Sequence, residues 1–169
     1  WWRLASTEWC GDGICHNENC STCSYDCGLC YPFGVFSATW NTSQISAGSS
    51  NASQVSLPLE STSIYDFTVD WGDENTTVVT GWNDPDANHT YAAEGIYTIN
   101  ITGTISGFRF NNGRDKLKIG NVNNWGNLRL GNSKSYFYGC ANLNSTATDN
   151  LNLAGTTDLE NMLFGASVF

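Results

Sequence analysis

The sequence predicts a mainly β protein in three parts, and three observations support this prediction. Six cysteines lie close together near the N-terminus. Apolar and polar residues alternate through the middle of the chain, as they do in half-buried strands. A similar motif then occurs twice near the C-terminus. We therefore expect a short aromatic segment (residues 1–9), a small disulfide-rich module (10–31), a β-sandwich (32–110) and a hairpin followed by a short solenoid (111–169).

Composition limits what the chain can do. Of the 169 residues, 40% are hydrophobic and 13% aromatic, which is enough for a packed core. The formal net charge is −9. Residues 1–108 carry twelve acidic residues and one basic residue, whereas residues 109–169 carry four and six. This asymmetry predicts head-to-tail attraction between copies, and the overall acidity argues against nucleic acid. We also expect no membrane span, because no run of eighteen apolar residues occurs.

The cysteine spacing, C-x4-C-x4-C-x2-C-x3-C-x2-C, indicates structural cross-links. The intervening residues favour turns and supply no apolar core. Zinc is less suitable, because the two C-x2-C pairs lie too close together for an intervening hairpin and leave two cysteines over. A redox motif would need a strand before it and a helix after it. We expect three disulfides, with the pairing open, among Cys10, Cys15, Cys20, Cys23, Cys27 and Cys30. Disulfides indicate an extracellular or cell-surface location.

The runs "CGDGIC" and "NCSTCSYDCGLC" resemble the small C-G-D-G-x-C module of secreted and surface proteins. This resemblance makes Asp12, Glu18 and Asp26 candidate ligands for Ca²⁺, since carboxylate oxygens are what calcium prefers. The alternative is that Asp12 and Asp26 only form Asx turns.

Alternation with a period of two predicts strands in the middle of the chain. In "SIYDFTVDWGD", Tyr65, Phe67, Val69 and Trp71 share one face. "GIYTINITGTI" alternates in the same way, and "FGVFSATW", "SQVSLPLE", "FRF" and "TTVVTGW" are weaker candidates. Short strands separated by Gly, Asn and Pro turns are typical of an all-β sandwich.

The runs "VDWGDENTT" and "NHTYAAEGIYTINITG" resemble the PKD-type immunoglobulin-like domain. The matching residues are Trp71, Gly72, Asp73, His89, Thr90, Tyr91, Gly95 and Tyr97. The resemblance implies an extracellular spacer or adhesion module with an Ig-like sandwich. We expect His89 to be a packing and hydrogen-bonding residue rather than a catalytic base. Asp84 and Asp86 should form a solvated acidic turn, with calcium binding as the alternative.

An internal repeat occupies the C-terminal part, after a predicted hairpin turn at Asn112-Gly113. "YFYGCANL" and "MLFGASVF" align at an offset of 26 residues, and "LRL" and "LNL" align at 23. Periods in the twenties predict a leucine-rich-repeat-like solenoid, and the motif resembles the BspA-like leucine-rich surface repeats. Cys140 falls on an apolar repeat position, so we expect a buried free thiol.

Only about two repeat units are visible, and stacked repeats need neighbours or caps. Either the chain continues or another chain covers the last unit. We expect the N-terminal aromatic segment of a second copy to contact it, which would build a homopolymeric filament. The predicted intersubunit residues are Trp1, Trp2, Leu4, Trp9, Phe164 and Phe169.

Seven N-x-S/T sequons indicate an N-linked glycoprotein. The acceptor residues are Asn19, Asn41, Asn51, Asn75, Asn88, Asn100 and Asn144.

No catalytic motif is present, whether G-x-S-x-G, H-E-x-x-H, a P-loop or a Rossmann fingerprint. We therefore expect a non-enzymatic structural glycoprotein of a surface fibre. The alternative is an adhesin that binds carbohydrate or a host protein through exposed aromatic residues such as Trp40, Trp82 and Trp125.

Overall fold

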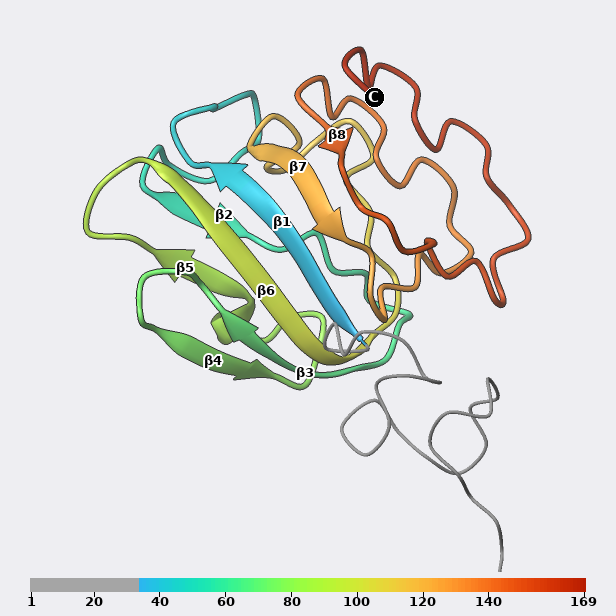
Figure 1. Ribbon diagram of the computed structural model, residues 1–169, viewed down its shortest axis with the longest axis horizontal. Coiled ribbons are helices and arrows are strands. Elements are labelled where there is room, and N and C mark those ends of the chain that lie inside the picture. Colours follow the sequence, from blue (N-terminus) through green and yellow to red (C-terminus); the bar gives the residue numbers. More distant parts are fainter. Residues whose placement is uncertain (1–33) are drawn as a thin grey trace, which may run out of the picture. The chain divides into compact units, whose positions relative to one another are not determined.

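The computed structural model of the protein describes residues 34–169 (Figure 1). The predictions for the aromatic segment, the six-cysteine module with its calcium ligands, and Asn19 lie outside the described residues. The elements in chain order are β1 (Val35–Asn41), β2 (Gln54–Ser56), β3 (Tyr65–Asp70), β4 (Thr76–Val79), the 3₁₀ turn η1 (Pro85–Ala87), β5 (Asn88–Thr90), β6 (Ile96–Ile105), β7 (Ile119–Asn124) and β8 (Asn144–Ser145). The prediction of a mainly β protein is confirmed for this part of the chain.

Six strands form one sheet in the order β4-β3-β6-β1-β7-β8, and β2 pairs with β5 in a separate two-stranded sheet. All neighbours are antiparallel except β7 and β8, which are parallel. Figure 1 shows β6 and β1 crossing the centre of the large sheet. None of the helices in residues 34–169 is long and apolar enough to cross a bilayer.

Strict alternation places one face of each central strand in the core. Phe67 and Val69 of β3 are buried. Asp66, which precedes Phe67, and Thr68, which lies between the two, are exposed. Ile101 of β6 is likewise 1% exposed. The inward faces pack in one cluster with Val55 of β2, with Ala87 and Tyr91 on either side of β5, and with apolar residues of the C-terminal segment. The predicted alternation over β3 and β6 is therefore confirmed.

The segment after β6 is buried, but it is not the predicted strand and hairpin. Phe108 and Phe110 are core residues, and Phe108 makes only an isolated bridge with Leu59. Asn112, with φ 59°, does form a tight turn. No paired strands flank that turn in the described chain, because the backbone of Phe110 bonds instead to Tyr136 (N to O, 2.7 Å). Pairing with a distant segment thus replaces the local hairpin.

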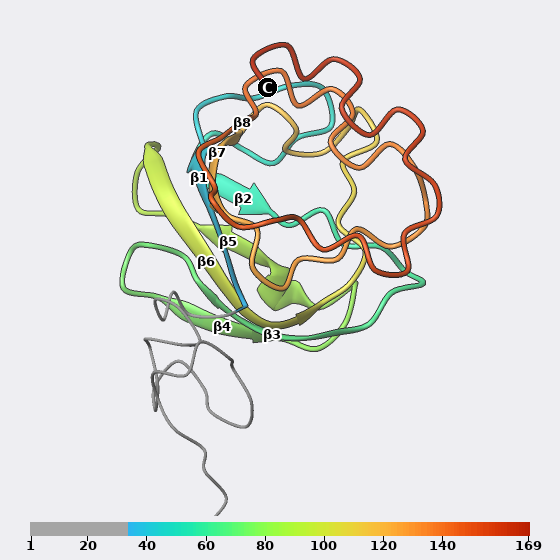
Figure 2. The ribbon, with the colours of Figure 1, turned by 45° about the vertical axis from the view of Figure 1, so that its right-hand side comes forward.

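Two successive segments stack at the β8 edge of the sheet. We call residues 119–143 the inner loop and residues 144–169 the outer loop. The N–H groups of Ser135, Phe137 and Gly139 donate to carbonyl oxygens 25 residues later, at 2.8, 2.9 and 2.8 Å. Arg129 also pairs in parallel with Asn152. Figure 2 shows the outer loop, in red, following the course of the inner loop, in orange.

Residues 34–169 form one compact unit. β7 belongs to the predicted repeat region, yet it pairs with β1 of the predicted sandwich. The expected boundary between residues 110 and 111 therefore falls inside a shared sheet and core.

Candidate functional site

The outer loop exposes five large apolar side chains, and two of them have inner-loop counterparts that are buried. Leu130 and Leu143 are fully buried, but Leu153 and Phe169, which lie 23 and 26 residues later, are 41% and 54% exposed. Phe164 is 63% exposed and touches only one edge of the inner loop, where its ring lies 5.3 Å from that of Tyr138. We call the exposed group the apolar end. Its members are Leu153, Leu159, Phe164, Val168 and Phe169.

The charges of the outer loop do not follow the predicted asymmetry. The loop carries three acidic residues and no basic residue, so the positive charge of residues 109–169 lies elsewhere. Asp149 accepts backbone hydrogen bonds from Trp125 and Gly126, at 3.1 and 2.7 Å. Asp158 and Glu160 both pair with Lys134 of the inner loop. The outer-loop acids are thus engaged within the chain, and its free surface is apolar rather than basic.

The two edges of the large sheet differ in what they present. β8, in the outer loop, forms one edge, and β4 forms the opposite edge. Val78 of β4 is 54% exposed. Because the edges are not alike, a contact that joins one to the other would be heterologous, which builds a ring or an open filament.

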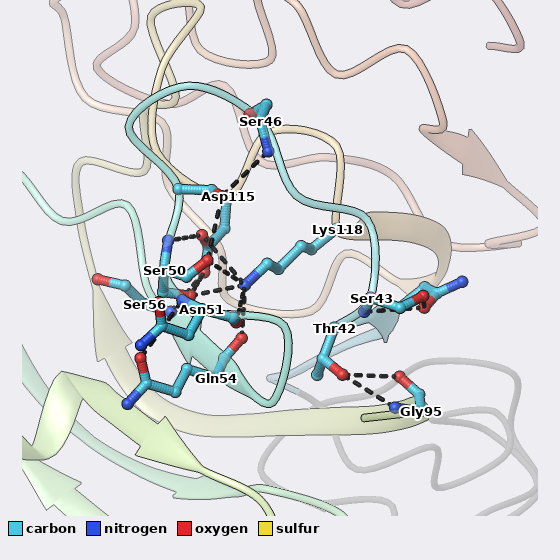
Figure 3. Close-up of polar contacts among 12 residues, drawn as sticks. Thr42, Ser43, Ser46, Ser50, Asn51, Gln54, Ser56, Gly95, Asp115 and Lys118 are labelled. Atoms are coloured by element: carbon cyan, nitrogen blue, oxygen red, sulfur yellow. Dashed lines mark hydrogen bonds and ion pairs between the residues drawn. The ribbon is translucent and has the colours of Figure 1, made fainter. Parts of the chain in front are cut away.

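A buried ion pair lies between the large sheet and the segment that precedes β2 (Figure 3). Asp115 and Lys118 are both fully buried, and their charged groups lie 3.5 Å apart. The Asp115 carboxylate accepts hydrogen bonds from the N–H of Ser50 and Ser56, each at 2.7 Å. The Lys118 ammonium donates to the carbonyl oxygens of Ser50, Asn51 and Gln54 at 3.0, 2.8 and 2.7 Å. The pair therefore fixes an irregular segment to the sheet.

This centre contains a serine and a lysine in contact, which raises the question of catalysis. The Ser50 hydroxyl lies 2.7 Å from both the Lys118 ammonium and the Asp115 carboxylate. Burial lowers the pKa of Lys118, and the Asp115 carboxylate opposes this change. However, a lysine base must be neutral to accept a proton, and every neighbour of this ammonium is an acceptor. The contacts favour the charged form, and with it a structural role.

The residues that carry the PKD resemblance lie together at the β3–β4 turn. His89 stacks on Trp71 at 4.9 Å and lies edge-on to Tyr91 at 4.5 Å. Its Nε2 lies 2.8 Å from the Asp73 carboxylate. Burial opposes the ionisation of Asp73, but hydrogen bonds with His89 and Asn75 outweigh it and hold the pKa of the carboxyl below its usual value. His89 thus occupies the expected packing and hydrogen-bonding position.

The three tryptophans proposed as ligand-exposed residues differ in burial. Trp40 is fully buried and Trp125 is 7% exposed, so both take the core position that is more usual for tryptophan and neither is a ligand contact. Their positions on the inward faces of β1 and the inner loop place them in the core. Trp82, next to η1, is 50% exposed. In the same turn, Asp84 caps η1 and accepts hydrogen bonds from Thr80 and Asp86.

Two polar hollows adjoin at Ser106, the residue that follows β6, at the end of the large sheet where β1 begins. The Arg129 hollow measures about 230 Å³ and is lined by Gly103, Thr104, Ile105, Ser106, Asn127 and Arg129. The Ser133 hollow measures about 340 Å³ and is lined by Thr62, Ser63, Ile64, Ser106, Gly131, Asn132 and Ser133. Ser106 belongs to both. No sequence motif marks these residues, because they come from four separate segments.

The predicted site residues are dispersed over the described chain. Phe164 and Phe169 lie in the apolar end. Among the sequons, Asn51, Asn75, Asn88 and Asn144 are exposed, and Asn41 and Asn100 are half-buried. Cys140 is a buried thiol without a disulfide partner, as predicted. Within residues 34–169, no three His, Cys, Asp or Glu side chains converge to hold a metal ion.

Sequence reasoning missed the buried ion pair and both hollows. The pair lies in the run "RDKLK", which reads as solvated charge. Its one available signal is the spacing of an acid and a base three residues apart in a chain with only 14% charged residues. Comparison of the chain with protein-family models, curated proteins and solved structures finds no match.

Proposed function

We propose that this protein is a non-enzymatic structural glycoprotein of the cell surface that assembles head to tail into a fibre. The observation that carries the proposal is the apolar end. Exposed apolar patches of this kind, on a stacked segment whose neighbouring layer buries the matching residues Leu130 and Leu143, are typical of interaction surfaces. Burial of each large apolar side chain in a contact would contribute about 1.5–3 kcal/mol.

The proposed occupant of the apolar end is the N-terminal aromatic segment of a second copy. Trp1, Trp2, Leu4 and Trp9 supply large apolar side chains in a segment with one Arg and one Glu. Phe164 and Phe169 of the apolar end would receive them. The contact joins different surfaces of two copies, so it is heterologous, and repeated without closure it builds a filament.

The proposal includes a modular interpretation of the chain. The disulfide-rich module, together with a PKD-type Ig-like sandwich and a leucine-rich-repeat-like solenoid, is a combination suited to an extracellular spacer. The clustering of Trp71, Asp73, His89 and Tyr91 supports the second element. The parallel pairing of β7 with β8 and the 25-residue stacking support the third.

Assembly is tested on the full chain by sedimentation velocity and negative-stain electron microscopy. We expect the unaltered chain to form fibres, and the F164D/F169D double variant to remain monomeric because charge on the apolar end opposes its burial. Deletion of residues 1–9 should have the same effect. Ile96→Asp is the matched control, because Ile96 is 71% exposed but lies in β6, and it should assemble normally.

Two results would contradict this assignment. Fibres that persist in both altered chains would show that the apolar end is not the contact. A full-length natural chain that carries a further layer after Phe169 and stays monomeric would show that the protein covers these side chains itself.

We expect N-linked glycans at the exposed sequons when the protein passes through a eukaryotic secretory pathway. Asn51 and Asn144 are exposed, and neither side-chain amide nitrogen bonds to another described residue. In contrast, the Asn100 amide donates to Asp70 and is half-buried. Glycopeptide mass spectrometry should therefore find higher occupancy at Asn51 and Asn144 than at Asn100. An unchanged mass after enzymatic glycan removal would rule out the glycoprotein assignment.

A second candidate function is an adhesin that binds carbohydrate or a host protein. The observation that favours it is the uncovered outer face of the large sheet. Thr68, Thr102 and Thr104 project there as exposed hydroxyl groups, beside half-buried Asn100. Such groups form hydrogen bonds readily with polar ligands.

A further inference from the structure

The Arg129 hollow and the Ser133 hollow combine uncharged hydrogen-bonding groups with glycine and isoleucine residues. Thr104, Ser106 and Asn127 line the first, and Ser63 and Ser133 are among those that line the second. Because the two hollows share Ser106, a ligand longer than one ring can occupy both. The Arg129 hollow, at about 230 Å³, lies below the usual range for small-molecule sites of about 300–1,000 Å³, and the Ser133 hollow, at about 340 Å³, lies at its lower end.

Arg129 is the only charged side chain in either lining. It is exposed, and its guanidinium has no carboxylate or hydrogen-bond partner among residues 34–169. The guanidinium of Arg109, the other arginine beside this region, already has partners. Its Nε donates to the Lys134 carbonyl, and its Nη1 lies 3.7 Å from Glu60 Oε1. A free guanidinium presents a planar fork of donors that matches a carboxylate.

Glu60 supplies an unpartnered acceptor next to the Ser133 hollow. Its side chain is 11% exposed, and its Oε2 is buried without a hydrogen-bond partner in the described chain. That oxygen lies 3.6 Å from the place a Cβ would take at Gly131, which lines the hollow. A buried acceptor without a donor is unfavourable, so a ligand hydroxyl group that reached this oxygen would stabilise it. Burial raises the pKa of Glu60, and a side-chain hydrogen bond with Ser133 and the charges of Arg109 and Arg114 oppose this change.

We propose that the two hollows form one binding site for an acidic saccharide, with the sugar carboxylate on Arg129 and ring hydroxyl groups on Ser106, Ser133 and Glu60. This inference rests on the adhesin candidate and names its ligand class and site. A free phosphate fits less well, because it would meet Arg129 but bring no donor to Glu60 and would be repelled by it. An acidic sugar carries both the anion and the hydroxyl donors.

The test uses the full chain on an array of uronate- and sialate-containing oligosaccharides printed beside their neutral methyl esters, followed by calorimetry with the best binder. We expect an acidic glycan to bind about tenfold or more tightly than its ester, since charge-assisted hydrogen bonds to a guanidinium are strong. Arg129→Gln should lose about the same factor. Arg114→Gln removes the same charge outside both linings and should bind as the unaltered chain does.

A second variant tests the junction of the hollows. Ser106→Gln places a longer side chain where they meet and should also lose about tenfold in affinity, while circular dichroism and the urea midpoint confirm that both variants remain folded. If a glycan binds but Arg129→Gln and Ser106→Gln leave its affinity unchanged, the site is wrong while the adhesin candidate stands. If no glycan binds, the saccharide site is wrong, and of the adhesin candidate only the recognition of a host protein stands. Equal binding of inorganic phosphate, or an equal loss in Arg114→Gln, would also overturn the proposal.

Discussion

At the scale of single residues, the buried ion pair Asp115–Lys118 carries the largest desolvation penalty in the described chain. Taking two charges out of water is unfavourable by several kcal/mol per ion unless their hydrogen bonds are satisfied. Here Ser50, Asn51 and Gln54 supply the oxygen atoms that replace water around the ammonium. The pair holds the segment before β2 in place, so this segment depends on two side chains that lie more than fifty residues away.

Lys118→Met should therefore destabilise the protein by about 3–5 kcal/mol, because it leaves the Asp115 carboxylate buried and uncompensated. Lys116→Met is the matched control. Lys116 lies two residues away and bonds only to Asn112 at the surface, so its loss should cost about 0.5 kcal/mol or less. Urea unfolding monitored by tryptophan fluorescence measures both. Equal effects of the two substitutions would show that the pair does not fix the fold.

The Asp73–His89 contact gives stability a pH dependence at the acidic end. The pKa of Asp73 is lower in the folded protein than its ordinary value of 3.8, so the unfolded chain takes up a proton first as the pH falls. The stabilisation is complete above pH 3.8 and is lost as the pH falls through the folded pKa. Unfolding midpoints of Asp73→Asn and the unaltered chain should differ at pH 7 and converge below pH 3.8.

The control for this pH series is Asp66→Asn. Asp66 is exposed on β3 and its side chain has no hydrogen-bond partner among the described residues, so this variant should follow the unaltered chain throughout. An offset between Asp73→Asn and the unaltered chain that does not shrink in acid would show that the carboxylate charge is not what His89 and Asn75 stabilise.

At the scale of elements, the sequence predicts strands most accurately where apolar and polar residues alternate along the whole strand. β3 and β6 alternate strictly, and their buried faces follow directly. The segment at Phe108–Phe110 could not be predicted in the same way, because its hydrogen bonds go to residues more than twenty positions away. The same holds for the hollows, whose linings are assembled from separate segments. The local sequence pattern is enough to predict a strand. A site lined by several stacked segments depends on how those segments align with one another, and the sequence of one segment does not determine this alignment.

Gly103 in β6 tests how closely neighbouring strands approach. It adopts φ +123°, and a Cβ there would lie 2.4 Å from the carbonyl oxygen of Asp66. Gly103→Ala should cost about 1–3 kcal/mol from backbone strain alone, with the clash added. Gly113→Ala is the control: its Cβ would meet nothing closer than 3.7 Å, so stability should stay within about 1 kcal/mol. An unchanged thermal unfolding midpoint in Gly103→Ala would show that β3 and β6 leave room for a Cβ at this position.

At the scale of the whole molecule, the described chain has one large sheet, with β4 at one edge and the stacked loops at the other, and a small second sheet of β2 and β5. Both the proposed fibre contact and the proposed saccharide site depend on the stacked loops. They use different surfaces, the apolar end in one case and the hollows at the end of the large sheet where β1 begins in the other. The two functions can therefore be separated by substitution, and a fibre that displays one saccharide site per subunit is compatible with the geometry.

Counting thiols tests the cross-linking predicted for the whole chain. The sequence has seven cysteines, and Cys140 is a fully buried free thiol whose pKa burial raises. Ellman's reagent without reductant should detect no thiol in the native protein and one in denaturant. Cys140→Ala should then give none. Seven reactive groups in denaturant would mean that the other six are reduced, and the prediction of three disulfides would be wrong.

The parallel pairing between β7 and β8 has a consequence for how such proteins change in evolution. Neighbouring strands lie about 4.8 Å apart. An in-frame tandem duplication of one 25-residue unit would therefore move the apolar end outward by about that distance and leave the existing strands unchanged. Each new terminal unit would then expose apolar side chains of its own, as the apolar end does now. Rods of graded length, each with such an end, can thus arise without any change to the existing sheet.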